Sequence, residues 1–317
     1  MGDVLRRNEL QIWFLADTSY PPAVDTCRRE SPGGIMTATA ESSVTLPSGE
    51  TISALGQGTW HFAERPEHRA SEITALRVGI DLGMTVIDTA EMYADGAAEV
   101  LVGEAIADCR DDVFLVSKVL PHHASRRGTV LACQASLRRL DTDHLDLYLL
   151  HWRGPIPLED TLAGFADLVA AGAVRYWGVS NFDTPDMVEL EHLSHGGAVA
   201  TNQVLYNLSR RGPEYDLLPW CRAHGIPIMA YSPIEQGRIL HHPAIVEVAH
   251  RHRATAAQIA LAWVLRSEDV NAIPRAGTPD DVRENAAAVE LQLTTADFII
   301  LDAAFPPPRH RAPLQVL

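Results

Sequence analysis

The chain has 317 residues, of which 46% are hydrophobic and 21% are charged, a composition that supports a large buried core in one barrel-sized domain. Its 41 acidic and 26 basic residues give a formal net charge of −15, and no stripe gathers the basic side chains, so we expect no nucleic-acid partner. No run of about 20 apolar residues occurs, so we expect no membrane-spanning segment.

Residues 1–35 differ in pattern from the rest of the chain. They mix charged residues, Pro, Gly and isolated apolar residues without a sustained period, which is typical of a disordered extension. Met36 is an alternative start of the natural chain. Residues 36–317 are predicted to form a single domain.

A regular pattern begins near residue 43. Residues 44–53 predict a β-hairpin, because two short strand-like segments flank the turn sequence Pro47-Ser48-Gly49. Apolar runs of strand length then recur at 54–58, 85–89, 113–118, 145–150, 174–179, 199–204, 226–231 and 270–274. We expect the short N-terminal hairpin to close the bottom of the fold that these strands build.

Longer segments with helical spacing separate the apolar runs, and the clearest are 73–82, 158–171 and 255–263. Thr255 suits a helix N-cap, and Gly172 suits a helix stop. Strands that are apolar throughout favour a parallel sheet covered on both faces. Eight of them alternating with helices favour an α/β fold of the closed (β/α)8 TIM barrel type. No G-x-G-x-x-G motif follows any strand, which counts against the doubly wound dinucleotide fold.

Seven of the eight predicted strands end in hydrogen-bonding or charged side chains. In a TIM barrel, the C-terminal ends of the strands meet at one mouth, where catalytic residues lie. The residues are Asp88 and Thr89, Ser117 and Lys118, His151 and Trp152, Ser180 and Asn181, Asn202 and Gln203, Tyr231 and Ser232, and Arg275. Any one of them is explained by a strand that ends in solvent, but seven in a row favour a shared functional site.

Four residues near this mouth suit the polarisation and protonation of a carbonyl group: Asp88, Tyr93, Lys118 and His151. A tyrosine phenol has a reference pKa of about 10. A neighbouring Lys118 ammonium would lower that pKa, and Asp88 would hold the ammonium charged. His151 would hydrogen-bond the carbonyl oxygen and orient it. No side chain supplies a hydride, so we expect a cofactor.

Other interpretations of these four residues stay open at this point. Asp88 could cap a strand end, Tyr93 could be an ordinary surface residue, and His151 could be structural. Lys118 could form a Schiff base, as lysines at the strand ends of barrel aldolases do. In that case the protein would be a lyase.

Several segments resemble the motifs of the aldo-keto reductases. They are Asp88-Thr89-Ala90-Glu91-Met92-Tyr93 with Gly103-Glu104 downstream, Leu145-Asp146-Leu147-Tyr148-Leu149-Leu150-His151-Trp152, Gly178-Val179-Ser180-Asn181-Phe182, Ala230-Tyr231-Ser232-Pro233, and Ile273-Pro274-Arg275-Ala276-Gly277-Thr278 with Glu284-Asn285. The resemblance covers roughly residues 42–317 in unbroken order. Gly58-Thr59-Trp60 and the segment 304–308 look closest to bacterial members described as methylglyoxal reductases.

The resemblance implies NADPH-dependent reduction of small aldehydes, ketoaldehydes or ketones to alcohols. Tyr93 would be the general acid, Lys118 its pKa-lowering neighbour, and Asp88 the anchor of the lysine. His151 would orient the carbonyl group. The implied substrate contacts are Trp60, Tyr93, His151 and Trp152, with His122 near the mouth. No metal is implied.

The resemblance also implies a set of cofactor-binding residues: Thr59, Trp60, Asp88, Ser180, Asn181, Gln203, Tyr231, Ser232, Pro233, Gln236, Gly237, Arg275, Ala276, Thr278, Glu284 and Asn285. Ser180, Asn181 and Gln203 would hydrogen-bond the nicotinamide carboxamide, and Tyr231 would stack on its ring. The loop 232–237 would wrap the pyrophosphate. The segment 275–278 would meet the adenosine 2′-phosphate, and residues 284–285 would meet the adenine.

One position departs from the family pattern. Many NADPH-preferring members have an arginine three residues after the position of Thr278, where this chain has Asp281. An acidic side chain that points inward there would repel a 2′-phosphate. Arg275 can still pair with the phosphate through two hydrogen bonds, so we expect NADPH, with NADH as the alternative.

The tail after Pro308 is short, so we expect that it cannot close over a bulky ligand and that the substrates are small. Some relatives of the family bind the cofactor as regulatory subunits of channels, and a subunit with negligible turnover is an alternative function. The four cysteines (Cys27, Cys109, Cys133 and Cys221) have neither CxxC nor metal-site spacing. They predict reduced thiols in a cytoplasmic protein, which we expect to be a monomer.

Overall fold

The structure is a computed structural model and describes residues 42–317. The predicted extension over residues 1–35 and the alternative start at Met36 lie outside the described residues and stay predictions. The described residues belong to one compact unit. The predicted domain boundary at residue 36 also stays a prediction.

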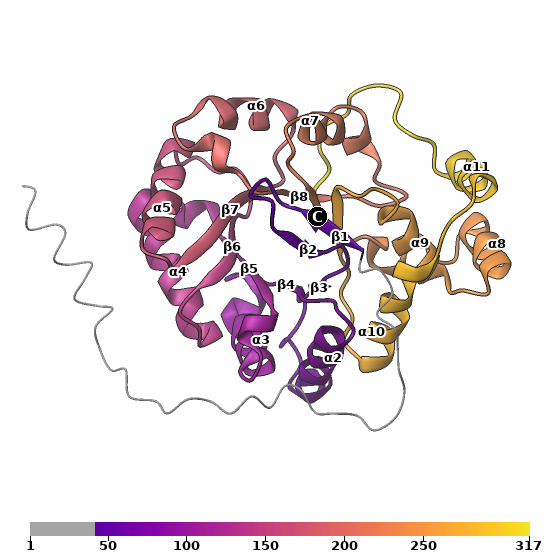
Figure 1. Ribbon diagram of the computed structural model, residues 1–317, viewed down its shortest axis with the longest axis horizontal. Coiled ribbons are helices and arrows are strands. Elements are labelled where there is room, and N and C mark those ends of the chain that lie inside the picture. Colours follow the sequence, from indigo (N-terminus) through magenta and orange to yellow (C-terminus); the bar gives the residue numbers. More distant parts are fainter. Residues whose placement is uncertain (1–41) are drawn as a thin grey trace, which may run out of the picture. The chain divides into compact units, whose positions relative to one another are not determined.

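Eight parallel strands form the central sheet of the described part of the chain (Figure 1). They are β3 (Gln57–Gly58), β4 (Val86–Asp88), β5 (Phe114–Val119), β6 (Leu145–Leu150), β7 (Val174–Ser180), β8 (Asn202–Leu205), β9 (Ile228–Tyr231) and β10 (Val270–Ile273). Each strand pairs with the next one along the chain. A parallel bridge between Leu55 and Ala272 joins the two ends of the sheet, and the Gly56 N–H donates to the Ala272 carbonyl at 2.8 Å. The predicted (β/α)8 TIM barrel is confirmed.

The first predicted strand, 54–58, is regular only at its end. β3 covers Gln57 and Gly58 alone, and a Cβ atom at Gly58 would lie 2.8 Å from the carbonyl oxygen of Ile273. Glycine is required there because the backbones of the two barrel-closing strands touch. The other seven predicted strands overlap the observed ones.

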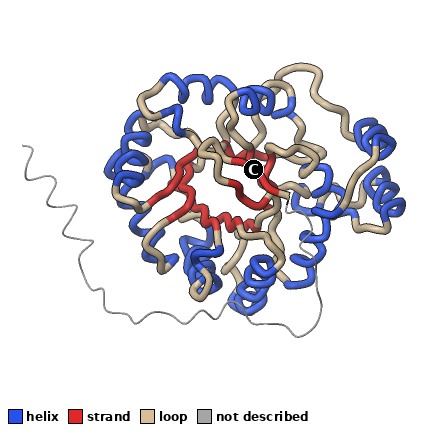
Figure 2. The backbone as a smooth tube through the Cα atoms, viewed as in Figure 1, coloured by secondary structure: helices blue, strands red, loops and turns tan. Residues whose placement is uncertain are grey.

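Helices surround the ring of strands (Figure 2). They are α2 (Arg69–Asp81), α3 (Ala97–Ile106), α4 (Arg126–Leu140), α5 (Leu158–Ala170), α6 (Thr184–His192), α7 (Leu217–Ala223), α8 (Pro243–His252), α9 (Ala256–Val264), α10 (Pro279–Ala286) and α11 (Thr295–Ala304). The 3-10 helices are η1 (Pro66–His68), η2 (Tyr93–Gly96), η3 (Arg110–Asp112), η4 (Pro121–His123), η5 (Gly196–Ala198), η6 (Gly212–Glu214), η7 (Glu235–Gly237) and η8 (Ala287–Glu290). Within residues 42–317, no helix has both the length and the apolar character needed to cross a membrane.

The three helices that the sequence predicts most clearly correspond to α2, α5 and α9. Gly172 follows the end of α5 with a φ of 74°, a left-handed conformation that glycine adopts without strain. Thr255 caps α9 and accepts a hydrogen bond from the Gln258 N–H at 3.2 Å. Local sequence signals therefore set these helix ends.

The predicted hairpin consists of β1 (Ser43–Thr45) and β2 (Thr51–Ser53), which pair antiparallel with Val44 opposite Ile52. Val44 and Ile52 belong to the buried apolar cluster that also contains Phe114 and the other side chains of the barrel interior. Phe114 begins β5, so the hairpin covers the N-terminal end of the barrel. The expectation that it closes the bottom is confirmed, and the opposite end is left as the mouth.

The C-terminal tail returns from α11 to the barrel. Arg311 pairs with Asp216 at 3.1 Å and with Asp183 at 3.4 Å, and Gln315 accepts a hydrogen bond from Arg210 at 3.2 Å. In Figure 2 the C-terminus lies over the ring of strands. These contacts hold the tail on the side of the barrel where the strands end.

Candidate active site

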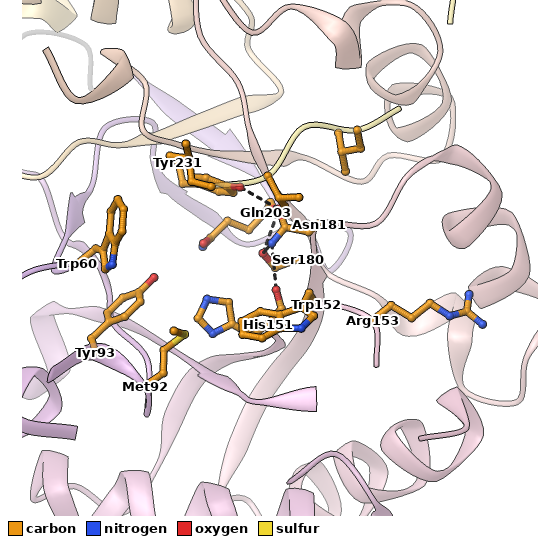
Figure 3. A pocket seen from close by; sticks show the side chains of 13 residues that line it. Trp60, Met92, Tyr93, His151, Trp152, Arg153, Ser180, Asn181, Gln203 and Tyr231 are labelled. Carbon is orange, nitrogen blue, oxygen red and sulfur yellow. Dashed lines mark hydrogen bonds between the residues drawn. The ribbon is translucent and has the colours of Figure 1, made fainter. Parts of the chain in front are cut away.

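A cavity of about 470 Å³ opens where the barrel strands end (Figure 3). Its lining consists of Trp60, Met92, Tyr93, His151, Trp152, Arg153, Ser180, Asn181, Gln203, Tyr231, Leu314, Val316 and Leu317. The cavity thus brings together the residues predicted to bind substrate and those predicted to bind the nicotinamide. Asp88 and Lys118 do not line it; both are buried.

Lys118 contacts two of the other predicted catalytic residues, Asp88 and Tyr93. Its side chain is fully buried on β5, and Nζ donates to Asp88 Oδ2 at 2.7 Å and to the Thr89 carbonyl at 2.9 Å. The same ammonium lies 3.1 Å from Tyr93 Oη. Three oxygen atoms therefore surround the ammonium, and one of them belongs to the phenol that faces the cavity.

Tyr93 begins the 3-10 helix η2, in a tight turn after β4. The next three residues have left-handed backbones, with φ of 48° at Ala94, 52° at Asp95 and 88° at Gly96. Left-handed non-glycine residues are uncommon and often mark functional sites. This turn brings the phenol back over the end of the neighbouring strand, where Lys118 lies.

The electrostatics of Tyr93 correct one expectation. Burial, and then the negative charge of Asp88, raise the pKa of Tyr93 well above its usual value, so the net shift is opposite to the lowered pKa that the sequence analysis expected. The main reason is that burial disfavours the charged phenolate; in addition, Asp88, 2.7 Å from the Lys118 ammonium, offsets part of the stabilisation that the ammonium gives to a phenolate. Burial also lowers the pKa of Lys118, against the opposing effect of Asp88.

His151 follows β6 and meets Tyr93 edge to face, with ring centroids 5.9 Å apart. Burial, and then the charge of Lys118, lower the pKa of His151 from 6.5 to about 2. The imidazole is therefore neutral at physiological pH. Among the described residues its Nδ1 has no hydrogen-bond partner. The ring itself lines the cavity, where a neutral imidazole suits a hydrogen bond to a ligand.

The amide and hydroxyl side chains on the opposite wall form one hydrogen-bonded chain. Tyr231 Oη donates to Asn181 Oδ1 at 3.0 Å, and Asn181 Nδ2 donates to the His151 carbonyl at 3.1 Å and to Ser180 Oγ at 3.2 Å. Ser180 Oγ donates to the Gln203 carbonyl at 2.9 Å. The residues predicted to hold the nicotinamide are thus fixed in place by one another.

Gln203 also links this wall to the buried ion pair, a contact that the sequence analysis missed. Its Nε2 donates to Asp88 Oδ1 at 2.7 Å, so both carboxylate oxygens of Asp88 accept hydrogen bonds. Thr59 lies behind the same strand end, where its hydroxyl and its N–H both donate to the Asp88 carbonyl at 3.0 Å. Thr59 is fully buried and supports Asp88 from behind.

The predicted pyrophosphate loop, 232–237, follows β9 outside the cavity lining. Ser232 and Gln236 have left-handed φ values of 47° and 54°. Glu235, a residue of this loop that the sequence analysis missed, is buried and accepts hydrogen bonds from Asn207 at 2.8 Å and from Arg210 at 2.8 Å. The buried Glu235 carboxylate thus anchors the loop to Asn207 and Arg210. No local sequence pattern marks Glu235 for this role.

The predicted adenosine residues lie further along the chain, in the loop between β10 and α10 and in α10 itself (Figure 1). Arg275 is half-exposed and pairs with the buried Glu72 at 3.6 Å. Glu284 accepts a hydrogen bond from the Thr255 hydroxyl at 2.6 Å. Asp281, the departure from the family pattern, is exposed in the first turn of α10. The remaining members of this predicted set are Ala276 and Asn285, which are buried, and Thr278, the N-cap of α10.

The apolar walls of the cavity include side chains that the sequence analysis missed. Trp60 and Trp152 lie at the mouth as predicted, and Met92 lies beside them (Figure 3). His122 is not part of the lining. Arg153 extends away from the other labelled side chains in Figure 3 and pairs with Glu189 at 2.6 Å.

The short tail reaches the mouth of the barrel, a contact that the sequence analysis did not foresee; the expectation that it cannot close over a bulky ligand stays a prediction. Leu314, Val316 and Leu317 line the cavity. The physical reason is the pair of Arg311 contacts with Asp183 and Asp216, which direct the last residues inward. A tail of this length therefore suffices to form one wall.

Comparison with known proteins identifies the family. The family model described as aldo/keto reductase family matches residues 54–305, a span that contains every catalytic residue predicted above. The chain belongs to this family. The resemblance noted in the sequence is therefore confirmed.

Within this family, the chain is similar to individual proteins described as methylglyoxal reductases. It is 51% identical to methylglyoxal reductase YeaE of Escherichia coli K12 over 272 residues, which are 84% of this chain and 96% of that protein. It is 30% identical to methylglyoxal reductase DkgB of Salmonella typhimurium, over 78% of this chain and 91% of that one.

Solved structures agree with this assignment of the reductase. An aldo/keto reductase from Klebsiella pneumoniae in complex with NADP and acetate has a TM-score of 0.86 and 49% identity, over 88% of this chain and all of that one. A second structure from the same organism is in complex with NADPH, with a TM-score of 0.86 and 48% identity. The expected reaction class, NADPH-dependent reduction of carbonyl groups, is confirmed.

Proposed function

We propose that this aldo/keto reductase reduces small aldehydes and ketoaldehydes of the methylglyoxal type to alcohols, with Tyr93 as the proton donor. One observation carries the proposal: the phenol of Tyr93 faces the cavity and lies 3.1 Å from an ammonium that is itself paired with a carboxylate. The names of two relatives, both methylglyoxal reductases, support the substrate class.

The wall opposite Tyr93 suits a nicotinamide. Hydrogen-bonding groups of Ser180, Asn181 and Gln203 meet the aromatic ring of Tyr231 along one side of the cavity. Amide and hydroxyl groups beside a flat ring match a ligand with a flat ring that carries a carboxamide. These residues would hold the nicotinamide of NADPH, which supplies the hydride when it is bound.

The proton comes from Tyr93. Because its pKa is raised by burial and by Asp88, the phenol keeps its proton at neutral pH. As the carbonyl carbon receives a hydride, its oxygen becomes an alkoxide that is more basic than a phenolate, so the proton moves to it. The Lys118 ammonium, 3.1 Å away, stabilises the phenolate that remains.

His151 would orient the carbonyl group. Its pKa of about 2 keeps the imidazole neutral, so it does not compete with Tyr93 as an acid. A neutral imidazole can donate one hydrogen bond to the carbonyl oxygen and hold it near the phenol. Proton donor and orienting group are thus separate residues.

The alternative role of Lys118 as a Schiff-base nucleophile is disfavoured by its surroundings. Nucleophilic attack requires a neutral amine that reaches the substrate. The Lys118 side chain is fully buried, and three oxygen atoms lie within 3.1 Å of its nitrogen. An ammonium held in this way is suited to act through Tyr93.

The volume of the cavity supports small substrates. The cavity of about 470 Å³ must hold both the nicotinamide ring and the substrate. Trp60, Trp152 and the tail residue Leu317 bound it, so little volume remains for a bulky group beside the reacting carbonyl. We retain the monomeric state and the cytoplasmic location as parts of the proposal.

Replacement of Tyr93 by Phe tests the proposal directly. Tyr93→Phe should lower kcat/KM for methylglyoxal by about 10² to 10⁴-fold, the usual contribution of a general acid. NADPH oxidation is followed at 340 nm over a panel of small and bulky aldehydes.

NADPH affinity, measured by protein fluorescence, is the control, and it should change little because the cofactor binds the opposite wall. A near wild-type rate for Tyr93→Phe would overturn the assignment of the proton donor. Tight NADPH binding by the wild-type protein with negligible turnover of every aldehyde would instead favour the regulatory-subunit alternative.

A further inference from the structure

Arg275 is held on three sides at the adenosine end of the site. Its Nη2 lies 3.6 Å from Glu72 Oε1, and its guanidinium carbon lies 5.3 Å from the ring centroid of Phe62. A Cβ atom at Gly277 would lie 3.5 Å from the same Nη2, so the guanidinium lies against the backbone of its own loop. The conformation of this half-exposed side chain is therefore set by its neighbours.

Glu72 connects this arginine to the frame of the barrel. The residue is 1% exposed, and its Oε2 accepts the Ala63 N–H at 3.0 Å. Its neighbour Ser71 donates to the Gly277 carbonyl at 3.0 Å. Two consecutive residues of α2 thus fasten the loop that contains Arg275.

The ion pair uses only part of the guanidinium. An arginine has five N–H donors in a planar fork, and the pair with Glu72 involves one Nη atom. Within residues 42–317, Arg275 has no ion pair with any other carboxylate. The remaining donors are available to a second anion at the exposed edge.

Burial of Glu72 favours its ion pair with Arg275. A buried carboxylate is costly unless it is paired with a cation, and Arg275 is the cation with which Glu72 pairs among the described residues. The carboxylate therefore retains the arginine before any cofactor arrives. An exposed arginine without such a partner would have to give up its rotamer freedom on binding.

We propose that Glu72 is a positioning residue that holds Arg275 toward the adenosine 2′-phosphate, and that it thereby contributes to the preference for NADPH over NADH. This inference rests on the proposed role of Arg275 as the 2′-phosphate ligand. Glu72 itself does not touch the cofactor. Its own negative charge opposes phosphate binding, but the pre-positioning of Arg275 outweighs this repulsion.

Glu72→Gln tests the proposal, because the amide keeps the shape and can still accept the Ala63 N–H but loses the charge. The readout is the affinity for adenosine 2′,5′-bisphosphate relative to 5′-AMP, measured by calorimetry, since these ligands differ only in the 2′-phosphate. The ratio should fall by about two- to ten-fold, the cost of ordering one arginine side chain on binding. KM for NADPH should rise while kcat is retained.

Glu67→Gln is the matched control: it removes an exposed carboxylate just before α2 and should leave the ratio unchanged. Glu72→Asp, which keeps the charge but withdraws it from Arg275, should give an intermediate loss even if Glu72→Gln proves unstable. Unchanged 5′-AMP affinity shows that the adenosine site has stayed folded. An unchanged or increased ratio in both Glu72 variants would overturn the inference.

Arg275→Ala separates this inference from the role on which it rests. A lower ratio in Arg275→Ala, with no further loss when Glu72→Gln is added, supports an action of Glu72 through the arginine. An unchanged ratio in Arg275→Ala would refute the phosphate role of Arg275, and the inference with it. Carbonyl reduction by Tyr93 would stand in either case, because these measurements involve no turnover.

Discussion

Lys118 is the only lysine in the chain, although 26 residues are basic. An ammonium is compact, whereas a guanidinium is planar and larger, and the Lys118 site is fully buried with oxygen atoms of Asp88, Thr89 and Tyr93 within 3.1 Å. A compact cation is what such a pocket holds. The unique lysine in an arginine-rich chain thus marks the centre of the site at the scale of one residue.

The buried His151 predicts a specific pH dependence of stability. Its pKa is about 2 in the folded protein and 6.5 when unperturbed. Between these values the unfolded chain binds a proton that the folded protein does not, so this contribution to stability is complete above pH 6.5 and is lost as the pH falls. His151→Gln removes the effect. Lowering the pH from 7 to 5 should therefore destabilise the variant by about 2 kcal/mol less than the wild type.

Denaturant unfolding at pH 7 and pH 5, followed by circular dichroism, measures this difference. His241→Gln, a change at an exposed histidine, should lose stability as the wild type does. Equal acid destabilisation of wild type and His151→Gln would show that His151 is not held neutral.

At the scale of the elements, helix caps connect the barrel frame to the predicted cofactor residues. Thr255 caps α9 and also donates to Glu284 Oε1 on α10 at 2.6 Å. Thr294 caps α11 with the same type of capping box, in which Asp297 takes the place of Gln258. The two caps are alike, but only the first contacts a residue of the predicted adenine site.

Thr255→Ala should lower the free energy of unfolding by about 1 kcal/mol, the usual effect of losing a cap. It should also weaken NADPH binding by about five-fold, because Glu284 loses a hydrogen bond that orients it. Thr294→Ala is the matched control and should lower stability by a similar amount with no change in NADPH affinity. Equal NADPH affinities in the two variants would contradict the assignment of Glu284 to the adenine site.

At the scale of the whole barrel, the two ends are closed in different ways. The hairpin of β1 and β2 seals the bottom with apolar side chains that join the barrel interior. The tail reaches the mouth through charged contacts of Arg311 and contributes Leu314, Val316 and Leu317 to the cavity lining. The sealed end stabilises the barrel, whereas the tail shapes the entrance.

Removal of residues 313–317 should therefore widen the cavity. The ratio of kcat/KM for a bulky aromatic aldehyde to that for methylglyoxal should rise by about ten-fold, the scale on which pocket walls discriminate substrates. The thermal unfolding midpoint should change little, because Val316 and Leu317 are more than half exposed. Arg309→Ala, an exposed change on the same tail, should leave the ratio unchanged. A ratio that is not altered by truncation would show that the tail does not limit access.

The sequence by itself determined the elements and the core of the chemistry. Strand-length apolar runs predict the barrel, and Thr255 and Gly172 mark helix ends, because these signals act between residues a few positions apart. The catalytic residues were predictable because each lies at or just after a strand end, and parallel strands bring such ends together.

The contacts between residues far apart in the sequence could be seen only in the tertiary structure. Gln203 donates to Asp88 across 115 positions of the chain, and Glu72 meets Arg275 only when the ring closes. The tail is held at the cavity by contacts of Arg311 and Gln315 with distant residues. The sign of the Tyr93 pKa shift also required the structure, because it depends on burial and on how completely Asp88 compensates Lys118. Glu72 left one local signal: it shares a helical face with Leu76 and Gly79, which are buried. Its partner could not be read from the same pattern, because periodicity reveals which face is buried but not what lies against it.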